Sequence, residues 1–446
     1  MDLANRLVVI VGLGRSGVAA AGLCLSRGAR VVGNDAARID QLSPEARELE
    51  KRGVELVVGG HDNAPWDEAD LVVVSPGVPD FPALARARAR GIEVIGETEL
   101  GARFAKAPIV AIGGTNGKST TTSLAAAMLE ASGIRVFAGG NLGVPLCEVV
   151  GEEHDVLVLE VSSFQTERLS SFRPRVAALL NVSADHLDRH PSFEAYVEAK
   201  GNVFARQLSD DVAVIPHGDP ICAEQAARGR AEVVTFGKGG DVHAEANAIV
   251  DSRRGRRYSL EGFRLEGEHN LENACAAAAI ASEIGANADG IAKALASFEG
   301  LAHRTVFVAE IDGVRFYDDS KGTNVGASVA ALVGMREERT VLIAGGRDKL
   351  GSYEPLVEAL KQKGRALVVL GEAAERIAAS AKGAIDTVHA SSMGDAVAKA
   401  ARLAKPGDAV LLSPACSSFD MFRSFGERGE AFVHAVRALA ERRRTG

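Results

Sequence analysis

The chain has 446 residues, which is enough for about three domains of ordinary size, each with its own hydrophobic core. Hydrophobic residues make up 46% of it and charged residues 25%, and this balance excludes long disordered or fibrous segments. The net charge is −8, so we expect no nucleic-acid partner, because phosphate backbones are bound by surfaces rich in basic side chains.

The cysteines and the apolar runs bear on where the protein works. The five cysteines are scattered, odd in number and lack any Cys-x-x-Cys spacing, which disfavours a disulfide framework and a zinc ribbon. No apolar run approaches the roughly 18 residues that a membrane-spanning helix needs. We therefore expect a cytoplasmic enzyme without membrane insertion, and we expect it to be a monomer.

The first part of the chain alternates between strand and helix patterns. Residues 7–11 form a short apolar run that ends in a glycine-rich turn, Gly12 to Gly17, and a helical composition follows up to Gly28. Further apolar runs at 31–33 and 71–74 continue the alternation, which predicts a parallel sheet. The pattern breaks near residue 98, so we predict a first domain over residues 1–98.

A second domain is predicted over residues 99–301. Residues 108–112 form a new apolar strand that leads into a second glycine loop, and a helix is expected from Ser119 to about Ala131. The apolar runs at 156–161 and 176–180 are typical of central strands in a parallel sheet. An alanine-rich helix is expected over residues 273–284.

The remaining residues, 302–446, are predicted to form a third domain. Asp312-Gly313 lies between two apolar runs and is the strongest hairpin signal in the chain. Apolar runs at 341–344, 366–370 and 409–412 alternate with helical stretches. The predicted fold class is therefore α/β with three domains: a Rossmann-like N-terminal domain, a central P-loop ATPase-like domain and a Rossmann-like C-terminal domain.

The segment from Gly113 to Thr120 predicts a phosphate-binding loop. It lies between a strand and a helix, where glycines let backbone N–H groups face phosphate oxygens and the helix N-terminus adds positive potential. Lys118 can neutralise phosphate charge, and Ser119 or Thr120 can bind Mg²⁺. Ile112 stands where the strict motif has glycine, so the loop is a shortened variant, and a plain tight turn is the alternative.

The turn at Gly12, Gly14 and Gly17, with Asp35 at the end of the next strand, matches the dinucleotide fingerprint. The same glycines and helix N-terminus serve any ligand with a diphosphate, because they do not contact nicotinamide. NAD, another nucleotide such as a uridine diphosphate sugar, and close helix packing with no ligand are therefore all open.

Several charged residues follow predicted strands or lie near the boundary at residue 301. Glu160 ends an apolar strand, where a metal ion shared with ATP and the loop hydroxyl would offset the cost of burying it; an ordinary acidic residue at a strand end or a helix cap is the alternative. His186 also follows a buried strand, in a segment that is equally typical of a capped loop. Arg304 and Lys321 could stabilise charge on a transferred phosphoryl group, or form a solvated salt-bridge cluster.

Taken together, these motifs resemble the Mur ligase family of peptidoglycan synthesis along the whole chain. The residues that carry the resemblance are Gly114 to Thr120, Glu160, Asp185-His186, His269-Asn270-x-x-Asn273, His303-Arg304 and Asp319-Ser320-Lys321. Within the family, four further segments look like those of the member that adds D-glutamate. They are Gly12 to Gly17, Ser75-Pro76-Gly77, Gly140 to Gly143 and Ser413 to Asp420.

The resemblance implies roles for individual residues. ATP would be held by Gly114, Thr115, Asn116, Gly117, Lys118, Ser119, Thr120, Asn270, Asn273, Arg304 and Asp319. Two Mg²⁺ ions would be held by Ser119, Glu160, His186 and Lys200, the last in carbamylated form. The catalytic residues would be Lys118, His186, Lys200, Arg304 and Lys321. The other substrates would be bound by Gly14, Arg15, Ser16, Gly17, Asp35, Ser75, Asn141, His186, Thr323, Lys349, Ser418 and Phe425.

The activity that the resemblance implies is ATP-dependent addition of D-glutamate to UDP-N-acetylmuramoyl-L-alanine through an acyl phosphate, in a pathway tied to cell-wall synthesis, cell division and cell shape. One departure affects the uridine contacts, because Ala36 and Ala37 follow Asp35 where relatives often have Thr or Ser and then Arg. The alternatives are the L-alanine-adding ligase of the family, an NAD-dependent oxidoreductase and a non-catalytic regulator that binds ATP at Lys118.

Overall fold

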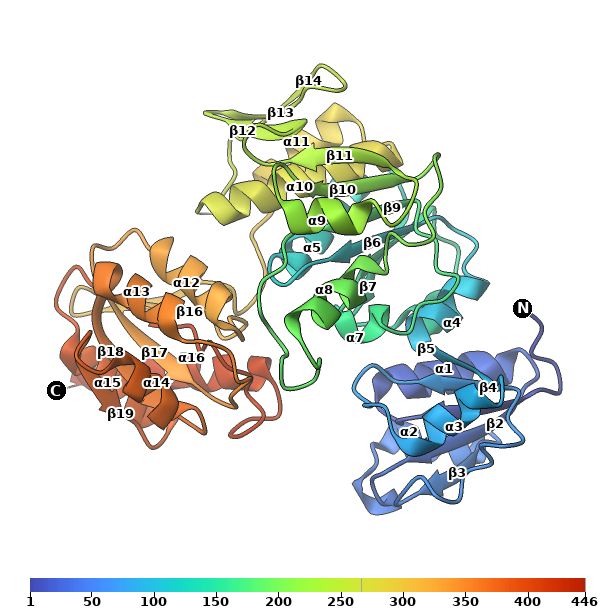
Figure 1. The fold of residues 1–446 in the computed structure, drawn as a ribbon. Coiled ribbons are helices and arrows are strands. Elements are labelled where there is room, and N and C mark those ends of the chain that lie inside the picture. The colour runs from blue at the N-terminus through green and yellow to red at the C-terminus, as the bar shows by residue number, and fades with distance from the viewer. Residues whose placement is uncertain (266, 446) are drawn as a thin grey trace. The chain divides into compact units, whose positions relative to one another are not determined.

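The structure is a computed structural model that describes residues 1–265 and 267–445 (Figure 1). The chain divides into two compact units. The first unit consists of Met1–Val182, Glu194–Phe263 and Glu272–Phe298, and the second of Ser183–Phe193, Arg264–Leu271 and Glu299–Gly446. The described residues form three sheets, two in the first unit and one in the second.

The N-terminal sheet is parallel and has the strand order β3-β2-β1-β4-β5. Its strands are β1 (Leu7–Val11), β2 (Arg30–Asp35), β3 (Glu55–Val58), β4 (Leu71–Val74) and β5 (Glu93–Gly96). The helices around it are α1 (Arg15–Ser26), η1 (Ile39–Gln41), α2 (Pro44–Lys51), α3 (Pro82–Ala89) and α4 (Glu97–Phe104). The chain order reverses between β1 and β4, and ligands of open α/β sheets bind at such a point.

Helix α4 joins the N-terminal sheet to the central one. It lies where the sequence predicted a break in the alternation of strands and helices. The Glu99 carboxylate accepts hydrogen bonds from the backbone N–H groups of Ser171 and Phe172, both at 3.0 Å. The Glu97 carboxylate accepts one from the Cys147 N–H, and burial raises the pKa of Glu97. In addition, one hydrophobic core continues from β1 into the central strands. Residue 98 lies inside α4, and the boundary there stays a prediction.

The central sheet has the order β14-β13-β12-β11-β10-β9-β6-β8-β7. Its strands are β6 (Ile109–Gly113), β7 (Val136–Gly140), β8 (Val156–Glu160), β9 (Val176–Leu179), β10 (Val212–Pro216), β11 (Glu232–Phe236), β12 (Val242–Glu245), β13 (Ala248–Asp251) and β14 (Arg256–Ser259). Its helices are α5 (Lys118–Ala131), α6 (Leu146–Val149), α7 (Ser163–Thr166), α8 (Phe193–Gly201), α9 (Pro220–Ala226), α10 (Glu268–Ile284) and α11 (Ala288–Ser297). The antiparallel pairs β12/β13 and β13/β14 were not predicted.

The C-terminal sheet has the order β15-β16-β20-β17-β18-β19 and is parallel except for β15. Its strands are β15 (Val306–Ile311), β16 (Val314–Asp318), β17 (Thr340–Gly345), β18 (Gly364–Leu370), β19 (Thr387–His389) and β20 (Ala409–Leu412). Its helices are α12 (Val325–Val333), α13 (Glu354–Lys363), α14 (Ala374–Ala381), α15 (Met393–Leu403) and α16 (Phe425–Thr445).

The hairpin between β15 and β16 is confirmed. Ile311 pairs with Val314, and the two turn residues Asp312 and Gly313 have φ angles of 52° and 77°. Such positive angles at both positions are those of the turn that Asp-Gly favours.

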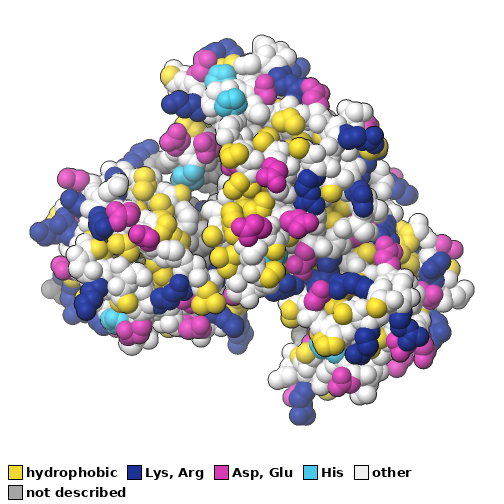
Figure 2. Space-filling view, viewed as in Figure 1, with side chains coloured by type: hydrophobic (Ala, Val, Ile, Leu, Met, Phe, Trp, Pro, Cys, Tyr) yellow, Lys and Arg dark blue, Asp and Glu magenta, His cyan; other side chains and the backbone are white. Residues whose placement is uncertain are grey.

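The surface carries side chains of both charges. Basic and acidic side chains occur on every part of the face in Figure 2, in keeping with 51 basic and 59 acidic residues in the chain. Within the described ranges, every helix is too short or too polar to cross a lipid bilayer.

Candidate functional site

The predicted phosphate loop connects β6 to α5, as expected. Gly114 and Gly117 have φ angles of 141° and 84°, which side-chain-bearing residues rarely adopt. A Cβ on Gly117 would overlap the Oδ1 atom of Asn273, so the loop leaves no room for a larger residue there. Lys118 begins a helix of 14 residues, so the loop leads into a helix N-terminus, whose positive potential favours an anion.

Hydrogen bonds with Asn181 hold this loop in its conformation. The Asn116 N–H donates to Asn181 Oδ1 at 2.9 Å, and Asn181 Nδ2 donates back to the Asn116 carbonyl at 3.1 Å. The Thr115 N–H donates to the Asn181 carbonyl at 2.9 Å. Lys118 Nζ donates to the Thr115 carbonyl at 2.8 Å, which keeps the ammonium group over the loop.

Oxygen donors lie next to the loop. The hydroxyls of Ser119 and Thr120 are buried in the first turn of α5, and Glu160 is buried at the end of β8 beside Ile112 of β6. The side-chain amide of Asn141 donates to Glu160 Oε1 at 2.6 Å. A hydroxyl and a carboxylate are hard donors of the kind that Mg²⁺ takes, together with phosphate oxygens and water.

Within the residues that the structure describes, no group of three or more His, Cys, Asp or Glu side chains is placed to hold a metal ion. The Ser119 hydroxyl and the Glu160 carboxylate fit an Mg²⁺ ion whose other ligands are phosphate oxygens and water.

Lys200 contacts the phosphate loop from a separate helix. It lies on α8 with 4% of its surface exposed, and its Nζ donates to the Gly114 carbonyl at 2.7 Å. The same Nζ lies 4.6 Å from the ring centre of Tyr196, whose hydroxyl is 3.1 Å from Thr115 Oγ1. Position therefore links Lys200 to the loop, while its carbamylation stays a prediction.

The fingerprint turn connects β1 to α1, and its three glycines differ in their surroundings. Gly12 has a φ of 83°, and a Cβ there would lie 2.6 Å from Val78 Cγ2. A Cβ on Gly17 would overlap the Gly12 carbonyl oxygen, whereas a Cβ on Gly14 would meet no atom within 4 Å. Gly14 is therefore the glycine that leaves open space in front of the turn.

Two polar side chains brace the fingerprint turn. Asp35 Oδ2 accepts from the Leu13 N–H at 2.7 Å and its Oδ1 from the Ala37 N–H at 2.8 Å. Ser75 Oγ donates to the Gly12 carbonyl at 2.7 Å. Both side chains were predicted to bind substrate; the structure shows that they hold the turn in place.

A cavity of about 770 Å³ begins at this turn and follows α1. Gly14 and Arg15 line one end of it, and Arg15 Nη2 lies 3.9 Å from the exposed carboxylate of Glu148 on α6. Ser16 is half-buried in the first turn of α1.

The second unit contains the predicted His186. This residue has a φ of 55°, and its N–H donates to Asp185 Oδ1 at 2.9 Å. The Asp185 carboxylate also accepts from Lys349 Nζ and from the Asn324 side-chain amide, both at 3.1 Å. Lys349 and His186, which were predicted as separate substrate contacts, are therefore connected through Asp185.

Two of the predicted charged residues, Asp319 and Lys321, lie just after β16 in the C-terminal sheet. The Asp319 carboxylate accepts from Ser413 Oγ at 2.6 Å and from the Thr305 N–H at 3.2 Å. Burial raises the pKa of Asp319 to about 6, although Ser413 and Arg304 act in the opposite direction. Lys321 donates its backbone N–H to the His303 carbonyl at 3.1 Å, and its ammonium lies 5.2 Å from the Phe425 ring centre.

The residues predicted to bind D-glutamate occupy three loops of the second unit. Thr323 precedes α12 and Lys349 follows β17. Ser418 is buried, and its carbonyl accepts from the Met421 and Phe422 N–H groups in the loop before α16. Phe425, at the start of α16, is 37% exposed.

The structure groups the predicted residues by unit. The first unit brings together the phosphate loop, Glu160, Asn141, Lys200 and Asn273, whose Oδ1 lies 3.4 Å from Thr121 Oγ1. The second unit contains Asn270, which was predicted with Asn273 as an adenine contact. It also contains His186, Arg304, Asp319, Lys321, Thr323, Lys349, Ser418 and Phe425.

Sequence reasoning missed the side chains that support these loops. Arg428 is 2% exposed and donates to the Ser320 carbonyl at 2.8 Å and to the Cys416 carbonyl at 3.1 Å, so it joins two loops of the second unit. Burial lowers the pKa of Arg428 to about 10. Asn181, Tyr196 and Asn324 act similarly, and no local motif marks any of them.

Matches to protein families cover most of the chain. Residues 6–96 match the Mur ligase MurD-like N-terminal domain, residues 112–281 the Mur ligase middle domain, and residues 303–416 the Mur ligase glutamate ligase domain. The chain belongs to the Mur ligase family. The resemblance predicted from the motifs is thereby confirmed.

Two curated members of the Mur ligase family show the likeness over the full length. The chain is 45% identical to the UDP-N-acetylmuramoylalanine--D-glutamate ligase of Geotalea daltonii, with 99% of each chain covered. It is 43% identical to the enzyme of the same name from Pelotomaculum thermopropionicum, over 98% of this chain and 99% of that one.

Solved Mur ligase structures share the fold. The UDP-N-acetylmuramate-alanine ligase MurC of Thermotoga maritima aligns with a TM-score of 0.60 at 20% identity, over 99% of this chain and 100% of that one. The MurF ligase of Thermotoga maritima in complex with ADP aligns with a TM-score of 0.62 at 20% identity, over 99% and 96%. These matches confirm the predicted three-domain α/β architecture.

Proposed function

We propose that this Mur ligase joins D-glutamate to UDP-N-acetylmuramoyl-L-alanine at the expense of ATP, in the synthesis of peptidoglycan precursors. The observation that carries the proposal is the 45% identity, over 99% of both chains, to a UDP-N-acetylmuramoylalanine--D-glutamate ligase. The oxidoreductase alternative loses its basis, because the fingerprint turn lies within the match to the MurD-like N-terminal domain.

The reaction has to activate a carboxylate, which is a poor electrophile because its charge repels an amine and oxide is a very poor leaving group. In the proposed first step, a carboxylate oxygen of the L-alanyl group attacks the γ-phosphorus of ATP, and ADP leaves. This forms an acyl phosphate. We assign the ATP phosphates to the loop from Gly114 to Thr120, where Lys118 supplies a positive charge.

In the second step, the D-glutamate amine attacks the carbonyl carbon of the acyl phosphate, and inorganic phosphate leaves as the amide forms. We assign D-glutamate to Thr323, Lys349, Ser418 and Phe425 of the second unit. The Asp185 carboxylate, which accepts from Lys349 Nζ, supports this assignment because it fixes the lysine side chain. We assign His186, Arg304 and Lys321 to orient the reacting groups.

We assign Mg²⁺ to Ser119 and Glu160 beside the phosphates, with His186 and carbamylated Lys200 for a second ion. Bound there, Mg²⁺ would supply positive charge to the phosphate oxygens. The buried position of the Ser119 hydroxyl and the Glu160 carboxylate supports the first of these assignments. The second rests on the resemblance and stays a prediction.

Four further statements stay predictions. They are the domain boundaries near residues 98 and 301, the monomeric state, the cytoplasmic location and the role in cell division and cell shape. We propose the cytoplasm because it supplies ATP and nucleotide-linked substrates.

Phosphate release tests the proposed function. The protein is incubated with ATP, Mg²⁺ and UDP-N-acetylmuramoyl-L-alanine, and release is compared with D-glutamate, with L-glutamate and without an amino acid. We expect release only with D-glutamate. A further reaction contains UDP-N-acetylmuramate and L-alanine in place of these substrates. Phosphate release there at the level seen with D-glutamate would instead support the alanine-adding alternative.

A further inference from the structure

A buried arginine of the first unit connects a helix of the central sheet to a loop of the N-terminal sheet. Arg168 follows the short helix α7, and 4% of its side chain is exposed. Its Nη2 donates to the Val78 carbonyl and to Asp80 Oδ1, both at 3.0 Å. The site residues and reaction steps assigned above include none of these three residues.

The loop that Arg168 contacts lies against the fingerprint turn. It consists of residues 75–81 and connects β4 to α3, and we call it the β4–α3 loop. The Ser75 hydroxyl donates to the Gly12 carbonyl at 2.7 Å, and a Cβ on Gly12 would lie 2.6 Å from Val78 Cγ2. The Val78 N–H donates to the Ser75 carbonyl at 3.0 Å. A shift of Val78 would therefore move the atoms that pack on the turn.

The backbone of Arg168 is fixed at the point where this loop begins. Its carbonyl accepts from the Gly96 N–H at 3.3 Å, and a Cβ on Gly96 would lie 3.4 Å from Arg168 Cβ. Gly96 ends β5 and pairs with Val74, the last residue of β4. The guanidinium therefore reaches the β4–α3 loop from a base that is held on the neighbouring strand.

The same short segment leads back to the ATP loop. Arg168 comes eight residues after Glu160, the carboxylate proposed for Mg²⁺ at the end of β8. Between them, Ser162 and Gln165 form a capping box that shapes the start of α7. Residues 160–168 thus join a proposed ligand of the nucleotide's metal ion to the loop that packs on the fingerprint turn.

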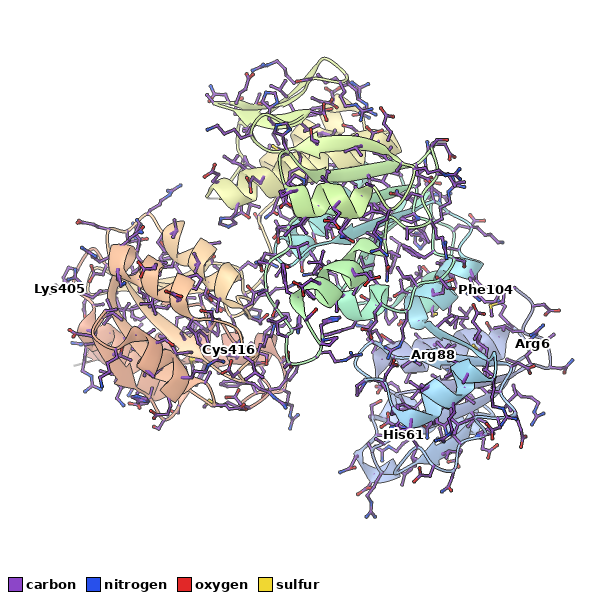
Figure 3. The ribbon with its side chains drawn as sticks, viewed as in Figure 1. Arg6, His61, Arg88, Phe104, Lys405 and Cys416 are labelled. Carbon is purple, nitrogen blue, oxygen red and sulfur yellow. The ribbon has the colours of Figure 1, made fainter. Side chains whose placement is uncertain are left out.

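A second arginine contacts the same carboxylate and differs in its origin. Arg88 of α3, labelled in Figure 3, donates to both Asp80 oxygens, at 2.9 and 3.1 Å. Hydrogen bonds from Arg88 and from Arg168 lower the pKa of Asp80, although burial acts in the opposite direction. Arg88 lies eight residues from Asp80 on the helix that the loop enters, so only Arg168 of the two holds the loop from the central sheet.

We propose that Arg168 is a positioning residue for the uridine nucleotide substrate. It acts through the Val78 carbonyl and the Asp80 carboxylate, which it holds so that the β4–α3 loop stays against the fingerprint turn. The turn then keeps the shape in which it receives the diphosphate group. The inference rests on the proposed function, because it takes this turn as the site of a uridine diphosphate group.

Steady-state kinetics of the full chain test the proposal, with phosphate release as the measurement. Arg168→Met keeps an apolar side chain of similar reach and removes the guanidinium. We expect its KM for UDP-N-acetylmuramoyl-L-alanine to rise about tenfold, while kcat and KM for ATP stay within about twofold of the wild type. A merely structural role would instead lower the amount of folded enzyme, which reduces kcat and leaves both KM values unchanged.

Two further variants control for the contact and for the fold. Arg88→Met removes the other arginine from the same carboxylate, and it should keep the wild-type KM because that ion pair is exposed. Asp80 is 60% exposed, so Asp80→Ala should fold and should raise KM for the uridine substrate even if Arg168→Met is unstable. The double variant Arg168→Met/Asp80→Ala should raise KM by less than the product of the two single effects.

The outcomes separate the inference from the function on which it rests. If folded Arg168→Met and Asp80→Ala keep the wild-type KM for the uridine substrate, or if Arg88→Met raises it equally, the inference is overturned while the proposed function stands. If phosphate release by the wild type does not depend on UDP-N-acetylmuramoyl-L-alanine, the proposed function fails and the inference fails with it.

Discussion

The two glycine loops of the first unit share a backbone plan and differ in their side chains. Each follows a buried parallel strand, contains at least one glycine with a positive φ and leads into a helix. The turn at Gly12 to Gly17 is braced by Asp35 and Ser75. The loop at Gly114 to Thr120 is braced by Asn181 and Lys200, and it carries Lys118 with two buried hydroxyls.

Glycine spacing alone therefore does not identify a ligand. Backbone N–H groups at a helix N-terminus suit any phosphate group, so both turns fit a nucleotide. A triphosphate brings more charge, and the loop with Lys118 next to Ser119 and Glu160 has the side chains to neutralise it and to share a metal ion. We therefore assign ATP to the second loop and the uridine nucleotide to the first.

The largest expected effect is on the ATP loop. Lys118→Ala should lower kcat/KM about 10³-fold, because it removes a charge that stabilises the transferred phosphoryl group. Steady-state phosphate release measures this loss. Lys238→Ala, which changes a lysine of the first unit outside both loops, is the control and should retain wild-type turnover. Turnover by Lys118→Ala near the wild-type level would contradict the assignment.

Within the fingerprint turn, the same substitution should destabilise the protein much more at one glycine than at another. Gly17→Ala should lower the free energy of unfolding by about 3 kcal/mol, because its Cβ would overlap a backbone carbonyl. Gly14→Ala should change it by no more than about 1 kcal/mol, since the site is open and only helix capping changes. Urea denaturation of the two variants checks this, and similar values for both would refute the packing argument.

The braces of the two loops should differ in strength. Asn181→Ala removes two side-chain hydrogen bonds to Asn116 and should cost about 2 kcal/mol of stability. Ser75→Ala removes one to the Gly12 carbonyl and should cost about 1 kcal/mol. Denaturation midpoints give the order, and a larger loss in Ser75→Ala would reverse the comparison.

The smallest effect is expected at two buried cysteines of the first unit. Cys24 on α1 and Cys275 on α10 are buried, and burial raises the pKa of each thiol to about 12. Both should resist iodoacetamide at pH 7, because the reactive thiolate is scarce and covered. Mass spectrometry of the treated native protein should find neither residue modified, and rapid labelling of either one would mean that its helix opens.

Local patterns predicted much of the fold. The strands β1, β4 and β20 begin and end where their apolar runs do, because turn residues bound each run. Helix α4 was missed, since Glu97 and Glu99 suggest a surface segment. Their burial depends on hydrogen bonds from distant residues, 147 and 170–172, which no local pattern shows. The strands β12 to β14 are short and partly exposed, which leaves little apolar pattern to detect.

The same limit applies to the candidate site. Both glycine loops are contiguous in sequence, so spacing and context predicted them with their helices. The braces come from far along the chain: Asn181 lies 65 residues from Asn116, and Arg428 lies 108 residues from Ser320. A contact of this kind depends on the folded arrangement of strands, which no local motif contains.

Calorimetric titration of two loop variants with both nucleotides tests whether each loop binds its own nucleotide. Gly14 has a φ of −69°, so Gly14→Leu should fold while its side chain fills the open space before the first turn. We predict that Gly14→Leu loses UDP binding and keeps ATP binding, and that Lys118→Ala does the reverse. Loss of the same nucleotide in both variants, or of neither, would contradict the assignment of one nucleotide to each loop.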